Sequence, residues 1–235
     1  MSVKMLSLEK KFIFIHIPKT GGNSVQRVLA EYSEDKIIVS NRIDEEKRYR
    51  GRGKSGFKNP VPQDGEDRFG VANLQYGLKK HATLAEYKNA LADEIYNNMY
   101  KFSILRNPWD RAISFYFSPH RGNVIWSRED FVNFVKIKML PVRSYIHQDV
   151  TKIDEQLNGG TLNKDIDFLL KFETLASDFK IVCDEIGVDY KPLPTLNKNP
   201  KKHYSYYYDD ALKDMIIEKF SDEIEFGGYE FNMDG

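Results

Sequence analysis

A four-residue apolar run followed by a glycine turn constrains the fold of this chain more than any other feature. Phe12-Ile13-Phe14-Ile15 lacks the alternation of a half-exposed strand and is typical of a strand buried on both faces of a parallel sheet. Gly21 and Gly22 permit a sharp turn, and the apolar spacing of residues 24–30 predicts a helix directly after it. The chain therefore opens as strand, glycine loop and helix.

The same order of elements recurs later in the chain. Phe102-Ser103-Ile104-Leu105 predicts a second buried strand, and Asn107-Pro108 is typical of a helix start, with Asn as the cap and Pro in the first turn. Helical spacing predicts further helices over residues 83–96, 128–140, 165–187 and 209–220. Strands that alternate with helices indicate the α/β class, here a three-layer, P-loop-like fold with a central, mostly parallel sheet flanked by helices.

Length and one atypical segment set the expected domain organisation. At 235 residues, the chain suits a single domain over residues 1–235. Residues 44–75 are rich in charge, Gly and Pro and poor in aliphatic side chains, which predicts a long surface loop excursion. This segment is either a solvated loop or a basic flap that contacts an anion.

Charge balance and cysteine content argue against several classes of protein. Lys and Arg number 35, as do Asp and Glu, so the formal net charge of zero gives no global field for nucleic acid. Cys183 is the only cysteine, so no intrachain disulfide forms. No run reaches the roughly 20 apolar residues of a membrane span, and the first residues lack a signal-peptide core. We expect a soluble, cytoplasmic protein, and the sequence leaves its oligomeric state open.

Residues 16–24 carry the groups expected of a phosphate site. Gly21 and Gly22 let the backbone approach a ligand closely, and the following helix offers N–H groups and the positive end of its dipole. Lys19 adds a charge before the glycines, so this is not the pattern G-x-x-x-x-G-K-[ST]. The remaining hydrogen-bond donors of the segment are Thr20, Asn23 and Ser24. Taken alone, the segment is also compatible with a simple tight strand–helix connection.

A second candidate anion site follows the second strand. Arg106 stands at the carboxyl end of that strand, where ligands of open α/β sheets bind. Ser114 lies about two helical turns further on and so shares a face of the following helix. An arginine fork and a hydroxyl make a suitable clamp for a phosphate dianion. Taken alone, Arg106 is also compatible with a structural role at the helix start.

Together these motifs resemble the carbohydrate-type sulfotransferases, the family that includes the heparan sulfate 2-O-sulfotransferases and their bacterial relatives. Residues 16–24 are similar to that family's 5′-phosphosulfate loop, residues 106–116 to its 3′-phosphate motif, and residues 167–179 to a late strand–helix block. Asn23 stands where the family usually has Thr. The chain lacks the membrane anchor and disulfides of the Golgi relatives, which favours a soluble bacterial or viral-type enzyme.

The resemblance implies an enzyme that moves a sulfuryl group in line from the donor PAPS (3′-phosphoadenosine 5′-phosphosulfate) to a hydroxyl acceptor, a glycan or glycoconjugate. The product PAP would leave, and no metal is expected. Lys19 and His81 are the implied catalytic residues, with His81 as the base. The implied donor-binding residues are His16, Pro18, Lys19, Thr20, Gly21, Gly22, Asn23, Ser24, Arg106, Ser114, Lys201 and Lys202.

The assignment of the base depends on the setting of His81. Sulfuryl transfer needs a group that takes the proton of the acceptor hydroxyl, and imidazole is the common choice. His81 precedes a predicted helix, so a capping or surface role is the alternative. No two histidines are spaced as metal ligands, which argues against a metal site.

Two other functions stay open at this point. A P-loop kinase-like phosphotransferase would need a Walker lysine and a carboxylate for Mg²⁺, and the sequence has no clear instance of either. A non-catalytic anion- or glycan-binding module would not need the catalytic side chains, yet Lys19, His81, Arg106 and Ser114 are all present.

Overall fold

The computed structural model describes residues 5–33, 78, 80–149, 162–194 and 202–233. In these ranges one sheet has the order β1-β2-β3-β4, with strands β1 (Leu6–Ser7), β2 (Phe12–Ile15), β3 (Tyr100–Leu105) and β4 (Phe168–Lys171). β2, β3 and β4 are parallel, and β1 pairs with β2 in the antiparallel sense. The mostly parallel sheet and the strands at 12–15 and 102–105 are therefore confirmed.

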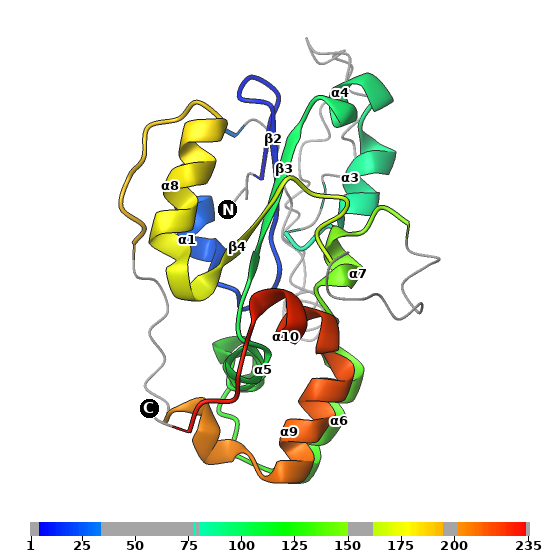
Figure 1. The fold of residues 1–235 in the computed structure, drawn as a ribbon, viewed down its shortest axis with the longest axis vertical. Coiled ribbons are helices and arrows are strands. Elements are labelled where there is room, and N and C mark those ends of the chain that lie inside the picture. Colours follow the sequence, from blue (N-terminus) through cyan, green and yellow to red (C-terminus); the bar gives the residue numbers. More distant parts are fainter. Residues whose placement is uncertain (1–4, 34–77, 79, 150–161, 195–201, 234–235) are drawn as a thin grey trace, which may run out of the picture.

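Helices cover both faces of the sheet (Figure 1). One face carries α1 (Gly22–Leu29) and α8 (Leu175–Glu185), and the other carries α3 (Leu84–Ala90), α4 (Asp93–Asn97) and α7 (Arg143–Ile146). β2 is buried at all four positions, as its unbroken apolar run predicts. The predicted three-layer α/β class is confirmed.

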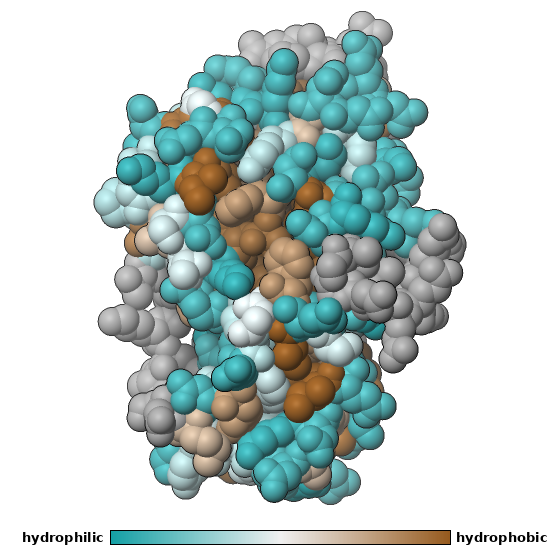
Figure 2. Space-filling view, in the orientation of Figure 1, coloured by the Kyte–Doolittle hydropathy of each residue, from teal (hydrophilic) through white to brown (hydrophobic). Residues whose placement is uncertain are grey.

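A second group of helices lies beyond the carboxyl ends of the strands (Figure 1). It comprises α5 (Pro108–Tyr116), α6 (Arg128–Lys138), α9 (Asp210–Lys219) and α10 (Ser221–Gly227). These helices share a hydrophobic cluster rich in aromatic side chains, among them Trp109, Tyr116 and Phe131. The helices predicted at 128–140 and 209–220 are confirmed, and α10 was not predicted. Figure 2 shows a largely hydrophilic face on which hydrophobic residues gather along the centre.

Two helix predictions are wrong in part. The helix predicted at 165–187 begins only at Leu175, because Phe168–Lys171 pairs with β3 as β4 and Phe172–Thr174 forms a short 3-10 turn. The helix predicted at 83–96 is two helices, because Leu91 and Ala92 have extended backbone. The acidic residues Asp93 and Glu94 then favour a new helix N-terminus.

The strand register brings the two predicted anion motifs to one edge of the sheet. Ile15 pairs with Ser103, and the Ser103 hydroxyl donates to the Ile15 carbonyl at 2.7 Å. His16 and Arg106 follow the two strands at their carboxyl ends, so both motifs face the second group of helices. The predicted loop at 44–75 and Lys201 lie outside the described residues.

Candidate functional site

The loop between β2 and α1, residues 16–21, has a backbone that depends on glycine. Gly21 has a φ of 86°, in the left-handed region, and a Cβ there would lie 2.7 Å from the Phe172 ring. A Cβ on Gly22 would lie 2.4 Å from the imidazole of His16. Both distances are shorter than real contacts, so the two glycines permit the close packing of this loop.

The helix that follows this loop begins without a side-chain cap. Gly21 is the N-cap of α1, it makes no capping hydrogen bond, and the first turn holds no acidic residue. The Ser24 N–H donates back to the Gly21 carbonyl at 3.0 Å. The positive end of the helix dipole has no acidic side chain beside it and is left to another partner. An anion is the partner that this geometry favours.

Three consecutive carbonyls of the loop are held by side chains. Thr20 Oγ1 donates to the Ile17 carbonyl at 3.0 Å, and Arg106 Nη1 donates to the Lys19 carbonyl at 2.8 Å. The Pro18 carbonyl between them accepts from Arg111 Nε at 3.4 Å. The predicted donor-binding residue Thr20 is fully buried, and its hydroxyl is used to fix the loop.

Arg106 lies where the loop meets α5. Its Nη1 is 3.4 Å from Ser114 Oγ, so the structure brings the predicted pair together. The guanidinium also packs 4.1 Å from the centre of the Phe172 ring and forms an ion pair with Asp110 one helical turn away. Asp110 was not assigned a role from the sequence, and it competes with any phosphate for the arginine.

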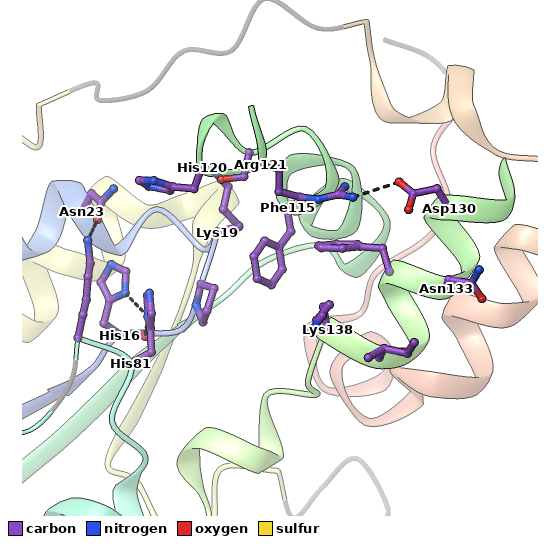
Figure 3. A pocket seen from close by; sticks show the side chains of 15 residues that line it. His16, Lys19, Asn23, His81, Phe115, His120, Arg121, Asp130, Asn133 and Lys138 are labelled. Atoms are coloured by element: carbon purple, nitrogen blue, oxygen red, sulfur yellow. Dashed lines mark hydrogen bonds and ion pairs between the residues drawn. The ribbon is translucent and has the colours of Figure 1, made fainter. Parts of the chain in front are cut away.

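A cavity of about 640 Å³ opens beside the loop (Figure 3). Its lining includes five of the residues predicted for the site, namely His16, Pro18, Lys19, Asn23 and His81. Figure 3 places His16, His81 and Asn23 on one side of the cavity, with Phe115, Arg121 and Lys138 across from them. Arg106 and Ser114 do not line the cavity. Arg106 contacts it only indirectly, through its hydrogen bond to the carbonyl of Lys19, which does line the cavity.

The far wall of the cavity was not predicted. It comes from α5, the turn after it and α6, and its residues are Phe115, Ser118, His120, Arg121, Asp130, Asn133, Phe134, Ile137 and Lys138. Lys80, on the near side, was not among the predicted catalytic or donor-binding residues, and its Nζ donates to Asn23 Oδ1 at 2.6 Å. Of the far wall, only Phe115 lies within a quoted motif, residues 106–116, and no motif joins the other elements.

The hydrogen bonds of His81 define its tautomer. Its Nδ1 lies 2.7 Å from the carbonyl oxygen of His16, which can only accept, so Nδ1 carries the proton. The lone pair of Nε2 is then the one left to accept a proton. The His81 side chain is exposed by surface area, yet the protein atoms around it reduce its hydration and, with the charge of Lys80, lower the pKa of His81 to about 4, although the carbonyl contact opposes the shift. The imidazole is therefore neutral near pH 7.

The alternative capping role for His81 is wrong. Thr83 is the N-cap of α3, and its hydroxyl accepts from the backbone N–H of Glu86. The Glu86 carboxylate accepts from the Thr83 N–H at 2.7 Å in return, which completes a capping box. His81 therefore takes no part in the helix start. It is an exposed residue, as the surface alternative has it, and it lines the cavity.

The cations around the loop repel one another. Partial burial of its ammonium lowers the pKa of Lys19, and the nearby charges of Arg106 and Lys80 lower it further. Removal of water also lowers the pKa of Lys80. An anion placed between these groups would relieve both effects, so the electrostatics agree with the uncapped helix end.

The remaining predicted residues lie elsewhere. Ser24 is a partly buried residue of α1 that does not line the cavity, and Lys202 lies over the Tyr206 ring, with Nζ 3.5 Å from its centre. Among the described residues, no group of three His, Cys, Asp or Glu side chains could hold a metal ion. Within the same ranges, no helix has the length and apolar character needed to cross a bilayer.

Comparison with known proteins identifies the family of this chain. The model of the sulfotransferase family matches residues 5–229. No curated protein sequence matches the chain. Among solved structures, the crystal structure of a sulfotransferase from Alicyclobacillus acidocaldarius is similar, with 16% sequence identity, coverage of 94% of this chain and 96% of that chain, and a TM-score of 0.42. Since the family match includes both anion motifs and His81, this chain belongs to the sulfotransferase family.

Proposed function

We propose that this sulfotransferase takes its sulfuryl group from PAPS and transfers it to a hydroxyl of a carbohydrate acceptor, with His81 as the base. The observation that carries the proposal is the fixed tautomer of His81 in the same cavity as Lys19. In-line transfer needs a base that takes the acceptor proton and a positive charge at the leaving oxygen, and the neutral imidazole of His81 and the ammonium of Lys19 would supply them.

The donor would bind along the edge of the sheet. The uncapped N-terminus of α1 and Lys19 suit the 5′-phosphosulfate. Arg106 and Ser114 suit the 3′-phosphate, provided that the phosphate shares the guanidinium with Asp110. These groups fit a nucleotide with two separate anionic ends.

The acceptor would enter the cavity from the side of α6. Phe115 and Phe134 supply ring faces of the kind on which the apolar face of a sugar packs, and Asn133 and Ser118 supply polar groups at the wall. In the transfer, the acceptor oxygen forms a bond to sulfur while its proton passes to His81 Nε2. The bond from sulfur to the phosphate oxygen breaks, Lys19 neutralises the charge on that oxygen, and PAP leaves.

Binding and turnover measured on the same preparation test the proposal. Calorimetry should detect PAP binding without metal, and mass spectrometry of a glycan panel incubated with PAPS should find products heavier by one sulfuryl group. Binding of ATP with Mg²⁺ but not of PAP would favour a phosphotransferase. Binding of a polyanionic glycan without any turnover of PAPS would favour a non-catalytic module.

A further inference from the structure

A fully buried ion pair joins α5 to α10 behind the phosphate loop. Arg111 Nη1 lies 3.1 Å from Glu223 Oε2, and the two side chains are 0% and 1% exposed. Such a pair is expensive to bury unless its other hydrogen-bonding atoms are satisfied. They are satisfied here, because Arg111 Nη2 donates to the Leu140 carbonyl at 2.8 Å and the Val142 N–H donates to Glu223 Oε1 at 2.6 Å.

One atom of this arrangement reaches the phosphate loop. Arg111 Nε donates to the carbonyl of Pro18, directly before Lys19. The carbonyl of Lys19 itself accepts from Arg106. The peptide planes on both sides of Lys19 are therefore each held by an arginine from the second motif.

Lys19 needs that support. Its φ of 69° lies in the left-handed region, which side chains other than glycine rarely adopt. A residue stays in such a conformation when its surroundings leave it no alternative. Because φ and ψ of Lys19 are set by the two planes that the arginines hold, loss of either contact frees the Lys19 backbone to relax and its ammonium to move.

We propose that Arg111 and Glu223 are positioning residues for Lys19, so that α10 is part of the catalytic apparatus without touching a substrate. The inference depends on the proposed function, in which the Lys19 ammonium meets the leaving oxygen. Glu223 fixes the guanidinium of Arg111, and Arg111 fixes the Pro18 carbonyl.

The chain contains a matched control on the same helix. Asp222 precedes Glu223 and forms an ion pair with Arg143 of α7, and no contact of that pair reaches the loop. Glu223→Gln removes the charge and keeps the shape, and it should lower kcat roughly 10- to 100-fold, as misplacement of a catalytic group does. KM for PAPS should change little. Asp222→Asn removes a comparable ion pair and should leave kcat at the wild-type value.

Arg111→Lys tests the same proposal from the arginine side of the ion pair. A lysine can still pair with Glu223, but its single ammonium cannot also serve the carbonyls of Pro18 and Leu140, so kcat should fall as in Glu223→Gln. If Glu223→Gln melts below the assay temperature, Arg111→Lys carries the same test. Wild-type kcat in a folded Arg111→Lys or Glu223→Gln protein overturns the proposal, as does an equal loss of kcat in Asp222→Asn.

A readout that does not need turnover separates this inference from the function. In amide NMR spectra, Glu223→Gln should shift the signals of Lys19 and Thr20, and Asp222→Asn should not. If the wild-type protein transfers nothing from PAPS, the proposed function fails, yet the shifts still report whether α10 positions the loop. Unshifted Lys19 and Thr20 signals in Glu223→Gln would contradict the positioning role even in an active enzyme.

Discussion

The two anion motifs follow parallel strands at the same sheet edge, but their helices begin in different ways. α1 starts at Gly21 with no side-chain cap and no acidic residue in its first turn. α5 starts at Asn107, whose Oδ1 accepts from the N–H groups of Trp109 and Asp110, and Asp110 adds a negative charge to the first turn. Only the first helix therefore offers its own N-terminus to an anion.

The difference indicates that the motifs bind by different means. The first motif presents backbone N–H groups, which requires glycine and a left-handed Lys19. The second motif presents side chains. Asn107 already accepts from the first N–H groups of α5, and the side chains of Arg106 and Ser114 lie together beside that helix. Variants of the two motifs should therefore affect different measurements.

The largest effect is expected at His81, which belongs to neither motif. His81→Ala should lower turnover by about 10²–10⁴ because the acceptor loses its base, while PAP affinity stays unchanged. The wild-type rate should rise with pH through about 4, since loss of hydration lowers the pKa of His81 to about 4 and only the neutral ring accepts a proton. An imidazole with an unperturbed pKa would instead give a rise near roughly 6.5.

Steady-state kinetics from pH 3.5 to pH 8, with melting temperature and PAP calorimetry on the same samples, make this measurement. A rise centred near 6.5 would show that the His81 ring is hydrated in the free enzyme and that its pKa is not lowered. A folded His81→Ala protein with the wild-type rate would assign the base to another group.

Lys19→Ala tests the first motif. Turnover should fall by about 10²–10³, as for loss of one group that stabilises developing charge. The melting temperature should not fall, because alanine keeps the same left-handed backbone and the variant removes an ammonium that Arg106 and Lys80 repel. Turnover and thermal melting measure the two quantities. Near-normal turnover would contradict the role of the loop in stabilising the leaving oxygen.

Arg106→Ala tests whether the second motif binds through side chains. PAP affinity should fall by about 10- to 100-fold, since hydrogen bonds to charged groups contribute about 1.5–3 kcal/mol. The loop should also loosen, because the Lys19 carbonyl loses its donor. Calorimetry with PAP measures the first effect, and Asp110→Asn serves as a control that frees the guanidinium and should strengthen binding.

Ser114→Ala should produce a smaller loss in the same measurement. A neutral hydroxyl contributes about 0.5–1.5 kcal/mol, which is roughly a 2- to 13-fold loss of PAP affinity. Arg106 keeps its ion pair with Asp110 and its hydrogen bond to the Lys19 carbonyl in this variant, so stability should barely change. Unchanged affinity in both Arg106→Ala and Ser114→Ala would rule out the second motif as the 3′-phosphate clamp.

Asn107→Ala should leave PAP affinity unaltered and reduce stability by about 1 kcal/mol, the usual effect of losing an N-cap. The reason is that the cap closes the end of α5 and does not itself face a ligand. Denaturant unfolding and PAP calorimetry check the two parts. A gain in PAP affinity would show that an opened α5 terminus can also act as an anion site.

Sequence patterns predicted the parts of this molecule whose signals are local. The run at Phe12, the glycine turn and the Asn107-Pro108 start each fix a short segment by themselves. Helical spacing alone extended the helix of α8 back over β4, whereas the resemblance of residues 167–179 to a strand–helix block agrees with the strand at Phe168–Lys171 and the helix after it. The first strand, at Leu6, was too short to predict.

The site was predictable where it follows a strand and not where separate elements meet. Arg106 directly follows β3 and Lys19 lies in the short loop that follows β2, so the parallel register of the two strands brings them together. Lys80, Phe115 and His120 come from three different segments, and only the packing of α5 on α6 and the path of the chain before α3 put them in one cavity. Asp110 was given no role from the sequence, because a carboxylate is not expected to pair with an arginine that is predicted to bind a phosphate.

The buried pair of Arg111 and Glu223 also sets an order of events during synthesis. Pro18 leaves the ribosome early, whereas Glu223, which fixes the partner of its carbonyl, follows 205 residues later. At ordinary rates of translation that interval is about 10–40 s. During most of it, Arg111, which is made 93 residues after Pro18, lacks the carboxylate that fixes its guanidinium. On the proposed role of this pair, the left-handed conformation of Lys19 is therefore secured only after α10 has been made and has packed against α5.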